Sequence, residues 1–288
     1  MRKGILLLGG SGTRFRPVTK VINKHLLPIL NRPMFFYSLS CLMLSNIRDI
    51  NIISDNKTVF LIKKLIGNGS NLGINLKYTI QKKAIGIPDG IKLSKKFIGK
   101  SDYALMLGDN FFYSDNLPKL LTNISKGRNN TIISYKVEKP ENFGVIKLNR
   151  NKTISKIVEK PKKFISNLAV TGFYFYQNKT LDLLNKLKRS KRGEFEITDF
   201  NNLIIRKYSL SNFELGRGAV WLDSGTPNDH HETAKFVKII EERTGKKIGM
   251  LEEVAFNMKF INKQKLMSLA KNNPLIEDKE YLLKTLRK

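Results

Sequence analysis

Short aliphatic and β-branched runs alternate with longer amphipathic runs over the first 135 residues of the chain. Such alternation is typical of strands joined by crossover helices, which pair side by side in a parallel sheet. Strands are predicted over residues 4–8, 49–54, 76–81, 103–107 and 131–135, and helices over residues 33–45, 58–66, 88–97 and 117–125. The pattern therefore predicts an α/β fold with a Rossmann-like, mainly parallel sheet.

Beyond residue 140 the rhythm changes to shorter strand candidates, over residues 144–148, 153–159 and 170–176, which makes the expected sheet mixed. The remaining predicted elements are a helix over 179–187, strands over 210–215 and 219–223, a helix over 227–244, and helices alone over 251–287. The chain has no internal repeat, low-complexity segment or flexible linker. We expect a core over residues 1–244 and a helical C-terminal region over residues 245–288 that packs on it.

The net charge of +28 would attract nucleic acid or other polyanions. The lysines, however, are scattered along the whole chain, and no aromatic-rich RNA motif, paired zinc ligands or compact basic arm concentrates them. We interpret the excess charge as solvated surface and expect no specific nucleic-acid partner.

The sequence predicts neither export nor a membrane span. No apolar run is long enough for a membrane span, and the N-terminal segment MRKGILLLGG leads directly into glycines. The single cysteine, Cys41, can form no intrachain disulfide and fits a reducing compartment, where we expect it to be a small buried hydrophobe. A soluble cytoplasmic protein is expected.

The sharpest local signal is the segment GILLLGGSGTRFRPVT, in which an apolar strand ends at a glycine-rich turn. The residues of this turn are Gly9, Gly10, Ser11, Gly12, Thr13 and Arg14. Glycines allow positive φ angles, so that successive backbone N–H groups can bind an anion, and Arg14 adds a charged fork for phosphate oxygens. The turn lacks the GK[ST] ending of a P-loop and the spacing of the dinucleotide motif GxGxxG. It predicts a nucleotide phosphate site, with an ordinary strand-to-helix turn as the alternative.

Three charged residues complete what phosphate chemistry needs. Lys24 follows the glycine turn closely enough to face the same cleft, whereas an isolated lysine would be surface solvation. Asp109 follows the apolar run YALMLGDN, and Asp223 follows the run AVWLDSG. Ligands bind at the carboxyl edge of parallel sheets, so this pair is a candidate Mg²⁺ site, although either residue alone would more often cap a turn or helix.

A third cluster lies in the second half of the chain. In the segment KIVEKP, the carboxylate of Glu159 can accept hydrogen bonds from sugar hydroxyl groups, and the ammonium of Lys160 can bind a phosphate. The alternative is an exposed ion pair between the two. Arg192, in SKRGEFEITD, can bind a phosphate or belong to a charged helix start. Taken singly, these residues leave both interpretations open.

Taken together, the motifs resemble one family. The segments GGSGTRFRPVT, NKHLLP, LGDNFFY, NFGVI, VEKP, AVTGFYFY, RGEFEITD, GRGAVWLDSGT and EEVAF occur in an order similar to that in bacterial glucose-1-phosphate thymidylyltransferases, which are sugar-phosphate nucleotidyltransferases. The similarity spans almost the entire chain. It implies a core of the nucleotide-diphospho-sugar transferase type with sugar-binding insertions, Mg²⁺ as cofactor, and a homotetramer.

The resemblance also implies roles for individual residues. Arg14 would bind the triphosphate, Lys24 would contact the reacting phosphates, and Asp109 with Asp223 would hold Mg²⁺. The positions that match the base site are Gln81 and Gly86, with His25 beside the nucleotide; those that match the glucosyl site are Phe143, Gly144, Glu159 and Val170; and those at the sugar phosphate are Lys160 and Arg192.

The implied reaction is attack by the oxygen of glucose 1-phosphate on the α-phosphorus of dTTP, which yields dTDP-glucose and diphosphate for nucleotide-sugar biosynthesis. Phosphoryl-type transfer needs in-line positioning and neutralisation of charge, which cations and a metal can supply. A nucleophilic serine or cysteine is unnecessary. The three histidines, His25, His230 and His231, are not needed as general bases.

Four departures from the family pattern lie near the nucleotide and the sugar. Leu8 stands where the family has alanine, so the larger side chain would either repack the strand or crowd the ribose and base. His25 replaces a glutamine. Asp89, in GIPDG, replaces the glutamine of a segment close to GLAQA, and would either face the nucleotide or cap the next helix. Phe143 replaces a tyrosine and loses one hydroxyl near the sugar.

A second group of departures, Ser114, Asp115 and Asn257, lies around the family's feedback site, so regulation is expected without a defined ligand. Three alternatives to a dTTP-dependent enzyme remain open from the sequence. They are the same chemistry with UTP or another triphosphate, a non-catalytic nucleotide-sugar sensor, and a nucleic-acid-binding protein that rests on charge alone.

Overall fold

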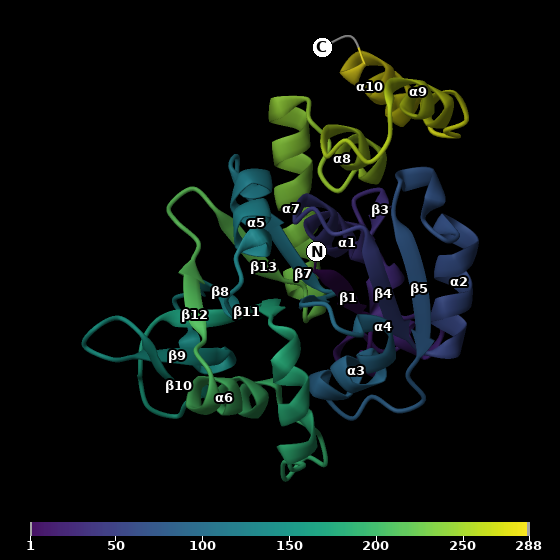
Figure 1. Cartoon of the computed structure of the whole chain (residues 1–288). Coiled ribbons are helices and arrows are strands. Elements are labelled where there is room, and N and C mark those ends of the chain that lie inside the picture. The colour runs from purple at the N-terminus through teal and green to yellow at the C-terminus, as the bar shows by residue number, and fades with distance from the viewer. Residues whose placement is uncertain (1, 287–288) are drawn as a thin grey trace.

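A computed structural model of the protein describes residues 2–286, and its centre is a nine-stranded mixed sheet (Figure 1). Seven strands form one path in the order β10 (Ile154–Glu159), β9 (Gly144–Leu148), β11 (Leu168–Tyr176), β6 (Tyr103–Leu107), β1 (Lys3–Leu7), β4 (Asp49–Ser54) and β5 (Asn75–Ile80). Beside this path, β8 (Thr131–Lys136) pairs with β11, and β12 (Ser211–Glu214) pairs with β8.

The sheet has a parallel half and a mainly antiparallel half. β1 pairs in parallel with both β4 and β6, and β4 pairs in parallel with β5. β11 then runs antiparallel to β6 and to β8, and β9 runs antiparallel to β10. The expected α/β fold with a mixed, mainly parallel central sheet is therefore confirmed. The carboxyl ends of the parallel strands, with their following loops, share one edge.

Helices cover both faces of the sheet, because alternate side chains of each strand point to opposite faces. Leu6 and Leu8 belong to the core beneath α1 (Met34–Leu44), α2 (Asn56–Ile66) and α5 (Leu117–Lys126). Ile5 and Leu7 belong to the opposite core, with α3 (Ile87–Leu93), α4 (Lys95–Ile98), the 3₁₀ segment η6 (Asn178–Lys186) and α6 (Ile197–Lys207). Cys41 is buried in α1, as expected, and burial raises the pKa of its thiol to about 12.

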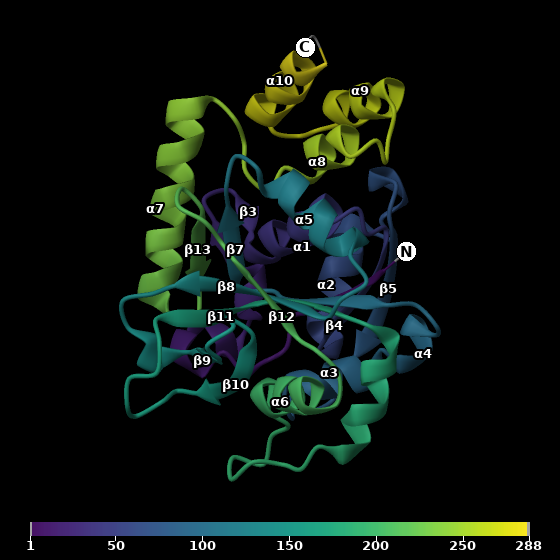
Figure 2. The same cartoon turned by 60° about the vertical axis from the view of Figure 1, so that its left-hand side comes forward.

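A second, two-stranded sheet stands apart from the first. β7 (Asn110–Tyr113) pairs antiparallel with β13 (Val220–Asp223), which leads into α7 (Pro227–Thr244). Three helices follow, α8 (Leu251–Asn257), α9 (Lys263–Lys271) and α10 (Ile276–Thr285), and they gather at the top of the view in Figure 2, above α1 and α5. Leu251 and Ala255 of α8 join the core beneath α1. Residue 287, the end of the predicted helical stretch, lies outside the described residues, and the domain boundary at residue 244 stays a prediction.

Several predicted elements differ from the observed ones. The helix expected over residues 88–97 is interrupted at Ser94, whose buried hydroxyl accepts a hydrogen bond from the Asn51 side chain at 2.9 Å. The segment predicted as a helix over 179–187 is a 3₁₀ helix, in which Leu181 and Leu184 lie three residues apart on one buried side. β7 and α6 were not predicted.

The remaining elements are short. They are the strands β2 (Pro28–Ile29) and β3 (Arg32–Pro33) and the 3₁₀ turns η1 (Thr13–Phe15), η2 (Val18–Lys20), η3 (Lys24–Leu26), η4 (Ser70–Leu72) and η5 (Pro140–Asn142). Within residues 2–286, no helix combines the length and the apolar character that crossing a membrane requires.

Candidate active site

The glycine-rich turn leaves the end of β1 in a conformation that requires glycine. Gly10 and Gly12 have φ angles of 111° and 56°, which L side chains rarely adopt. A Cβ at Gly12 would lie 2.9 Å from the Thr19 side chain, whose hydroxyl donates to the Gly12 carbonyl at 2.7 Å. The contact with Thr19 thus fixes the conformation of the turn at Gly12.

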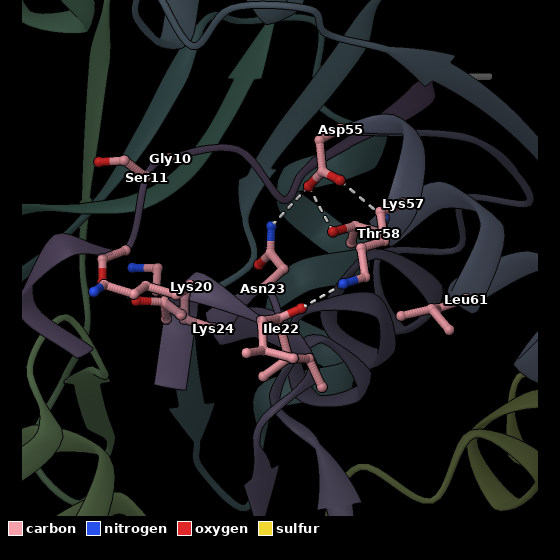
Figure 3. A pocket seen from close by; sticks show the side chains of 13 residues that line it. Gly10, Ser11, Lys20, Ile22, Asn23, Lys24, Asp55, Lys57, Thr58 and Leu61 are labelled. Atoms are coloured by element: carbon pink, nitrogen blue, oxygen red, sulfur yellow. Dashed lines mark hydrogen bonds between the residues drawn. The ribbon is translucent and has the colours of Figure 1, made fainter. Parts of the chain in front are cut away.

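A pocket of about 250 Å³ lies behind this turn, between it and the start of α2 (Figure 3). Gly10, Ser11 and Gly12 line it together with three lysines, Lys20, Lys24 and Lys57. Asp55 caps α2 by accepting from the backbone N–H of Thr58 at 2.9 Å, and Lys57 Nζ donates to the carbonyl of Val21 at 2.8 Å. The positive charge on this side of the turn favours an anion next to it. Thr13, predicted at the nucleotide, lines none of the three pockets described here.

Asp109 and Asp223 come together, as the sequence predicted, but from different sheets. Asp109 follows β6 at the carboxyl edge of the parallel half, whereas Asp223 ends β13 of the two-stranded sheet. Both lie at strand ends, as expected, but only Asp109 lies at the carboxyl edge of the parallel strands. The two residues meet because β13 pairs with β7, which begins directly after Asp109, and the backbone N–H of Ser224 donates to the Asp109 carbonyl at 2.9 Å.

The two carboxylates have opposite electrostatics. Burial and, next, the charge of Asp109 raise the pKa of Asp223 to about 7. Burial alone would raise the pKa of Asp109 as well, but the ammonium of Lys24, 2.5 Å from Asp109 Oδ2, holds that pKa well below its usual value. Arg14 lies close to Asp223: a Cβ at Gly225 would be 3.3 Å from both Asp223 carboxylate oxygens and 3.5 Å from Arg14 Nη1.

This donor set fits one particular kind of metal. Among residues 2–286 no group of three or more His, Cys, Asp or Glu side chains could hold a metal ion, so a closed zinc-type site does not form there. Mg²⁺ is commonly bound by one or two carboxylates together with substrate phosphates and water. Asp109 and Asp223 could supply two such carboxylates, and a divalent cation between them would relieve the repulsion by which Asp109 raises the pKa of Asp223.

Asn110 is a site residue that the sequence analysis missed. Its buried Oδ1 accepts hydrogen bonds from Trp221 Nε1 at 2.7 Å and from the backbone N–H of Gly172 at 2.8 Å. Its Nδ2 donates to Asp109 Oδ1 at 3.0 Å. Asn110 therefore ties β7 to β11 and β13 and holds Asp109 in place. Its position directly after Asp109 in the LGDN segment was the available signal.

The largest pocket at this edge, about 720 Å³, contains most residues expected at the sugar. The expected residues that line it are Arg14, Asp109, Phe143, Gly144, Glu159, Lys160, Val170 and Asp223. Thr198, on α6, donates to Glu159 Oε2 at 2.6 Å, and a Cβ at Gly144 would lie 3.1 Å from the same oxygen. We call this the acceptor pocket. Trp221 and Thr198 also line it and were not predicted.

A smaller pocket of about 310 Å³ adjoins the acceptor pocket and shares Asp109 and Glu159 with it. The expected residues that line it are Gly9, Gly10, His25, Gln81, Gly86, Asp109 and Arg192. A Cβ at Gly86, whose φ is 112°, would collide with the backbone oxygen of Phe195, so this position also requires glycine. We call this the nucleotide-side pocket.

The departures at residues 8, 25 and 89 take definite places. Leu8 is fully buried in the core beneath α1 and lines none of the three pockets, whereas its neighbour Leu7 lines the nucleotide-side pocket. His25 is buried, and its Nδ1 donates to Asn23 Oδ1 at 2.7 Å. Asp89 lines none of the three pockets and makes no capping bond at the start of α3; it accepts from the Gln81 side chain.

Arg192, expected at the sugar phosphate, lies at the edge of the smaller pocket. It lines the nucleotide-side pocket and is absent from the lining of the acceptor pocket. Its side chain is 58% exposed and forms two hydrogen bonds of 3.0 Å with the carboxylate of Glu196, four residues along the chain. The expected contact of Arg192 with a sugar phosphate stays a prediction. A local ion pair at the start of a helix, the other interpretation of its motif, describes the observed geometry.

Comparison with known proteins settles the family. The model of the family described as nucleotidyl transferase matches residues 3–240. The chain belongs to the nucleotidyl transferase family. The expected enzyme class, a nucleotidyltransferase, is thereby confirmed.

Relatives in the nucleotidyl transferase family cover nearly the whole chain. A glucose-1-phosphate thymidylyltransferase from Neisseria meningitidis is 40% identical over 287 residues, which are 99% of this chain and 100% of that protein. The enzyme of the same name from Xanthomonas campestris pv. campestris is 41% identical over 93% of this chain and 92% of its own. The resemblance identified from the sequence motifs is thus confirmed.

Solved structures show the same family fold. A Bacillus anthracis protein with the provisional name glucose-1-phosphate thymidylyltransferase, solved with sucrose, has a TM-score of 0.74 and 36% identity, and the match covers 82% of this chain and 95% of that chain. A UDP-glucose pyrophosphorylase solved with UDP-glucose has the same TM-score over 83% of this chain and 100% of that chain. At 24% identity the second structure shows the fold alone.

Proposed function

We propose that this protein transfers the thymidylyl group of dTTP to glucose 1-phosphate and releases diphosphate. The observation that carries the proposal is the meeting of two adjoining pockets at Asp109, with Lys24 bound to that carboxylate and Asp223 beside it. Two pockets with a charged, shared edge suit a reaction that joins two phosphate-bearing substrates. The Neisseria and Xanthomonas relatives carry the name of this reaction.

In the proposed reaction, an oxygen of the sugar phosphate attacks the α-phosphorus in line with the leaving diphosphate, and no covalent enzyme intermediate forms. Lys24 reaches the shared edge and can move from Asp109 to a phosphate oxygen when substrate enters. Arg14, exposed at the end of the glycine-rich turn, provides a fork for the leaving phosphates. These groups stabilise charge that spreads over the phosphate oxygens during transfer.

Mg²⁺ is the proposed cofactor, held by Asp109 and Asp223. When bound, it would neutralise phosphate charge and help to align the α-phosphate. The protein groups around it have separate tasks: Asn110 fixes Asp109, and Lys24 balances the carboxylate charge in its absence.

The test is release of diphosphate from purified protein given Mg²⁺, glucose 1-phosphate and, in separate reactions, dTTP, UTP, CTP, ATP or GTP. We expect turnover with dTTP, abolished by EDTA and restored by added Mg²⁺. If the folded protein turns over no pair of triphosphate and sugar phosphate, the enzymatic proposal fails. Binding of a nucleotide sugar without turnover would then support the sensor alternative.

A second candidate keeps this chemistry and takes UTP. The observation that favours it is His25, which lines the nucleotide-side pocket where the family has glutamine. The ratio of kcat/KM for dTTP and UTP in the same panel decides between the two candidates.

The resemblance also implies a homotetramer, a cytoplasmic location and a role in nucleotide-sugar biosynthesis. We retain all three as proposals. Light scattering coupled to size exclusion would give the assembly directly: a mass near four times 33.0 kDa supports the tetramer.

A further inference from the structure

Gln81 lines the nucleotide-side pocket, and its side-chain amide lies between Asp89 and Gly9. It follows β5, its side chain lines the pocket, and only 7% of the residue is exposed. Its backbone N–H donates to the Ser54 carbonyl at 2.8 Å. The amide at the tip of the side chain therefore has little freedom except to exchange its oxygen and nitrogen by a half turn.

Asp89 prevents that exchange. Gln81 Nε2 donates to Asp89 Oδ2 at 2.7 Å. A carboxylate only accepts hydrogen bonds, so the amide nitrogen must face Asp89 and the oxygen must face the other way. That oxygen lies over Gly9, where an added Cβ would be 2.9 Å from it, and none of the described residues donates a hydrogen bond to it.

Asp89 itself is anchored by the packing of its helix. It lies in the first turn of α3, directly after Pro88. At Gly90 an added Cβ would be 2.9 Å from Leu7 Cδ1, so α3 packs closely on β1. At the start of the helix, Gly86 forms a bridge with Phe195. The backbone of Asp89 is thus fixed beside Gln81 by the packing of α3.

A fixed amide distinguishes between pyrimidines. Uracil and thymine present an N–H donor at N3 flanked by carbonyl acceptors, whereas cytosine presents an acceptor at N3 next to an amino donor. An amide that is free to turn over matches either edge, because it carries both an acceptor and donors. An amide oxygen fixed opposite N3 accepts from the imide N–H but faces the lone pair of cytosine N3, so cytosine there leaves buried acceptors unpaired.

We propose that Asp89 is a positioning residue for base selection, which fixes the Gln81 amide so that its oxygen accepts the N3–H of an imide base. The inference rests on the proposed function, since it places the base in the nucleotide-side pocket. Asp89 acts through Gln81 and contacts no substrate. An asparagine or glutamine at this position would accept or donate and would leave the amide free to turn over.

The experiment measures equilibrium binding of dTTP, dUTP and dCTP to the full chain by calorimetry, with Mg²⁺ and without sugar phosphate. The variant is Asp89→Asn, which keeps the size of the side chain and lets it donate. The matched control is Asp49→Asn, because Asp49 accepts from the Asn75 side-chain amide at 2.9 Å in an exposed pair at the start of β4, at the opposite edge of the sheet.

In the wild type and in Asp49→Asn we expect dTTP to bind much more tightly than dCTP. In Asp89→Asn this preference for dTTP over dCTP should fall by about tenfold or more. The reason is that the amide of Gln81 can then turn over, so that cytosine no longer leaves buried polar groups without hydrogen-bond partners. The ratio for dUTP and dTTP should stay the same, since both bases carry the same imide. In a Gln81→Leu background, Asp89→Asn should change none of the ratios.

An unchanged preference for dTTP over dCTP in Asp89→Asn would overturn the proposal. So would an equal change for dUTP, or an effect that persists in the Gln81→Leu background, because a residue that merely supports the pocket would behave in that way. Thermal unfolding checks that each variant is folded, and Asp89→Ala replaces Asp89→Asn if the latter is not. Selective binding without turnover would refute the proposed reaction and leave this inference standing, whereas no binding of any of the three would refute both.

Discussion

The two pockets that share Asp109 are built in different ways. The nucleotide-side pocket takes Gly9 and Gln81 from the ends of β1 and β5, two strands of the parallel half of the sheet. The acceptor pocket takes Glu159 from β10 and Asp223 from β13, which belong to antiparallel pairs and to two different sheets. The loops that follow parallel strands all lie at the same edge of the sheet, so the nucleotide-side pocket forms there directly. The acceptor pocket depends instead on how strands distant in the sequence pair.

This difference predicts that substitutions will separate into three groups. Residues of the shared edge should affect the chemical step, residues of the acceptor pocket should affect only the sugar phosphate, and residues of the nucleotide side should affect the triphosphate or the stability of that half. The expected effects below run from the largest to the smallest.

Replacement of Asp109 by asparagine should have the largest effect, because this carboxylate belongs to both pockets and pairs with Lys24. We expect kcat to fall by roughly 100- to 1000-fold, the usual effect of removing one preorganised electrostatic group from an active site. Steady-state kinetics with both substrates in turn measures it, with Asp49→Asn as the control for a carboxylate far from the edge. A loss of less than about tenfold would mean that the two pockets do not meet at a reacting centre.

Replacement of Glu159 by glutamine should separate the two pockets. Glu159 lines both, but its Oε2 bonds Thr198 of the acceptor side at 2.6 Å. Removing a charged acceptor of sugar hydroxyls should raise KM for glucose 1-phosphate by roughly 10- to 100-fold. KM for the triphosphate should change by less than about twofold.

The control for this prediction is Glu214→Gln, since Glu214 pairs with Lys136 at 2.6 Å on the surface. If both KM values rise together in Glu159→Gln, Glu159 belongs to the shared edge and the division between the pockets must be redrawn.

Replacement of His25 by glutamine should alter how stability depends on pH. Burial and, next, the charge of Lys24 lower the pKa of His25 to about 3. In the unfolded chain the histidine has an ordinary pKa of about 6.5. Below that pH the unfolded state binds a proton at His25 and the folded state does not. The free energy of unfolding therefore falls as the pH drops from about 6.5 toward 3. Between pH 7.5 and pH 5 the wild type should lose about 2 kcal/mol more free energy of unfolding than His25→Gln.

Urea unfolding at the two pH values measures this difference within each protein, so an overall change in stability caused by the substitution cancels. Equal losses in both proteins would show that His25 becomes protonated in the folded state and that the nucleotide side is more open to water than its packing indicates.

The same contrast explains what the sequence could predict. Gly9 to Arg14 and Asp109 carry a local signal, because each directly follows an apolar strand of the parallel half. The mainly parallel sheet follows from the alternation of strands and helices along the chain. The alternation of side chains along the first strand also determines which side of the sheet Leu8 faces. In the structure this side is the core beneath α1.

What the sequence could not predict depends on pairing between distant segments. Asn110 acquires its role only because β7 pairs with β13 and brings Trp221 within 2.7 Å of it. Thr198 lies on α6, which brings it to Glu159, 39 residues earlier in the chain. The role of Asp89 depends on the orientation of one amide. The place of Asn110 directly after Asp109 marks it as a neighbour of the site, but the partners of these three residues have no signature within a few consecutive residues.

Replacement of Phe143 by tyrosine should give the smallest effect and tests the acceptor pocket from the opposite direction. The Phe143 ring lies 5.2 Å from that of Trp221, and its backbone carbonyl accepts from the N–H of Lys160 at 2.9 Å, so the ring is already fixed beside the pocket. A hydroxyl added to a fixed ring needs little ordering, and one hydrogen bond to a sugar should lower KM for glucose 1-phosphate by about two- to tenfold. The triphosphate KM should not change. A lower KM for the triphosphate instead would place this ring on the nucleotide side, and the assignment of the two pockets would have to be exchanged.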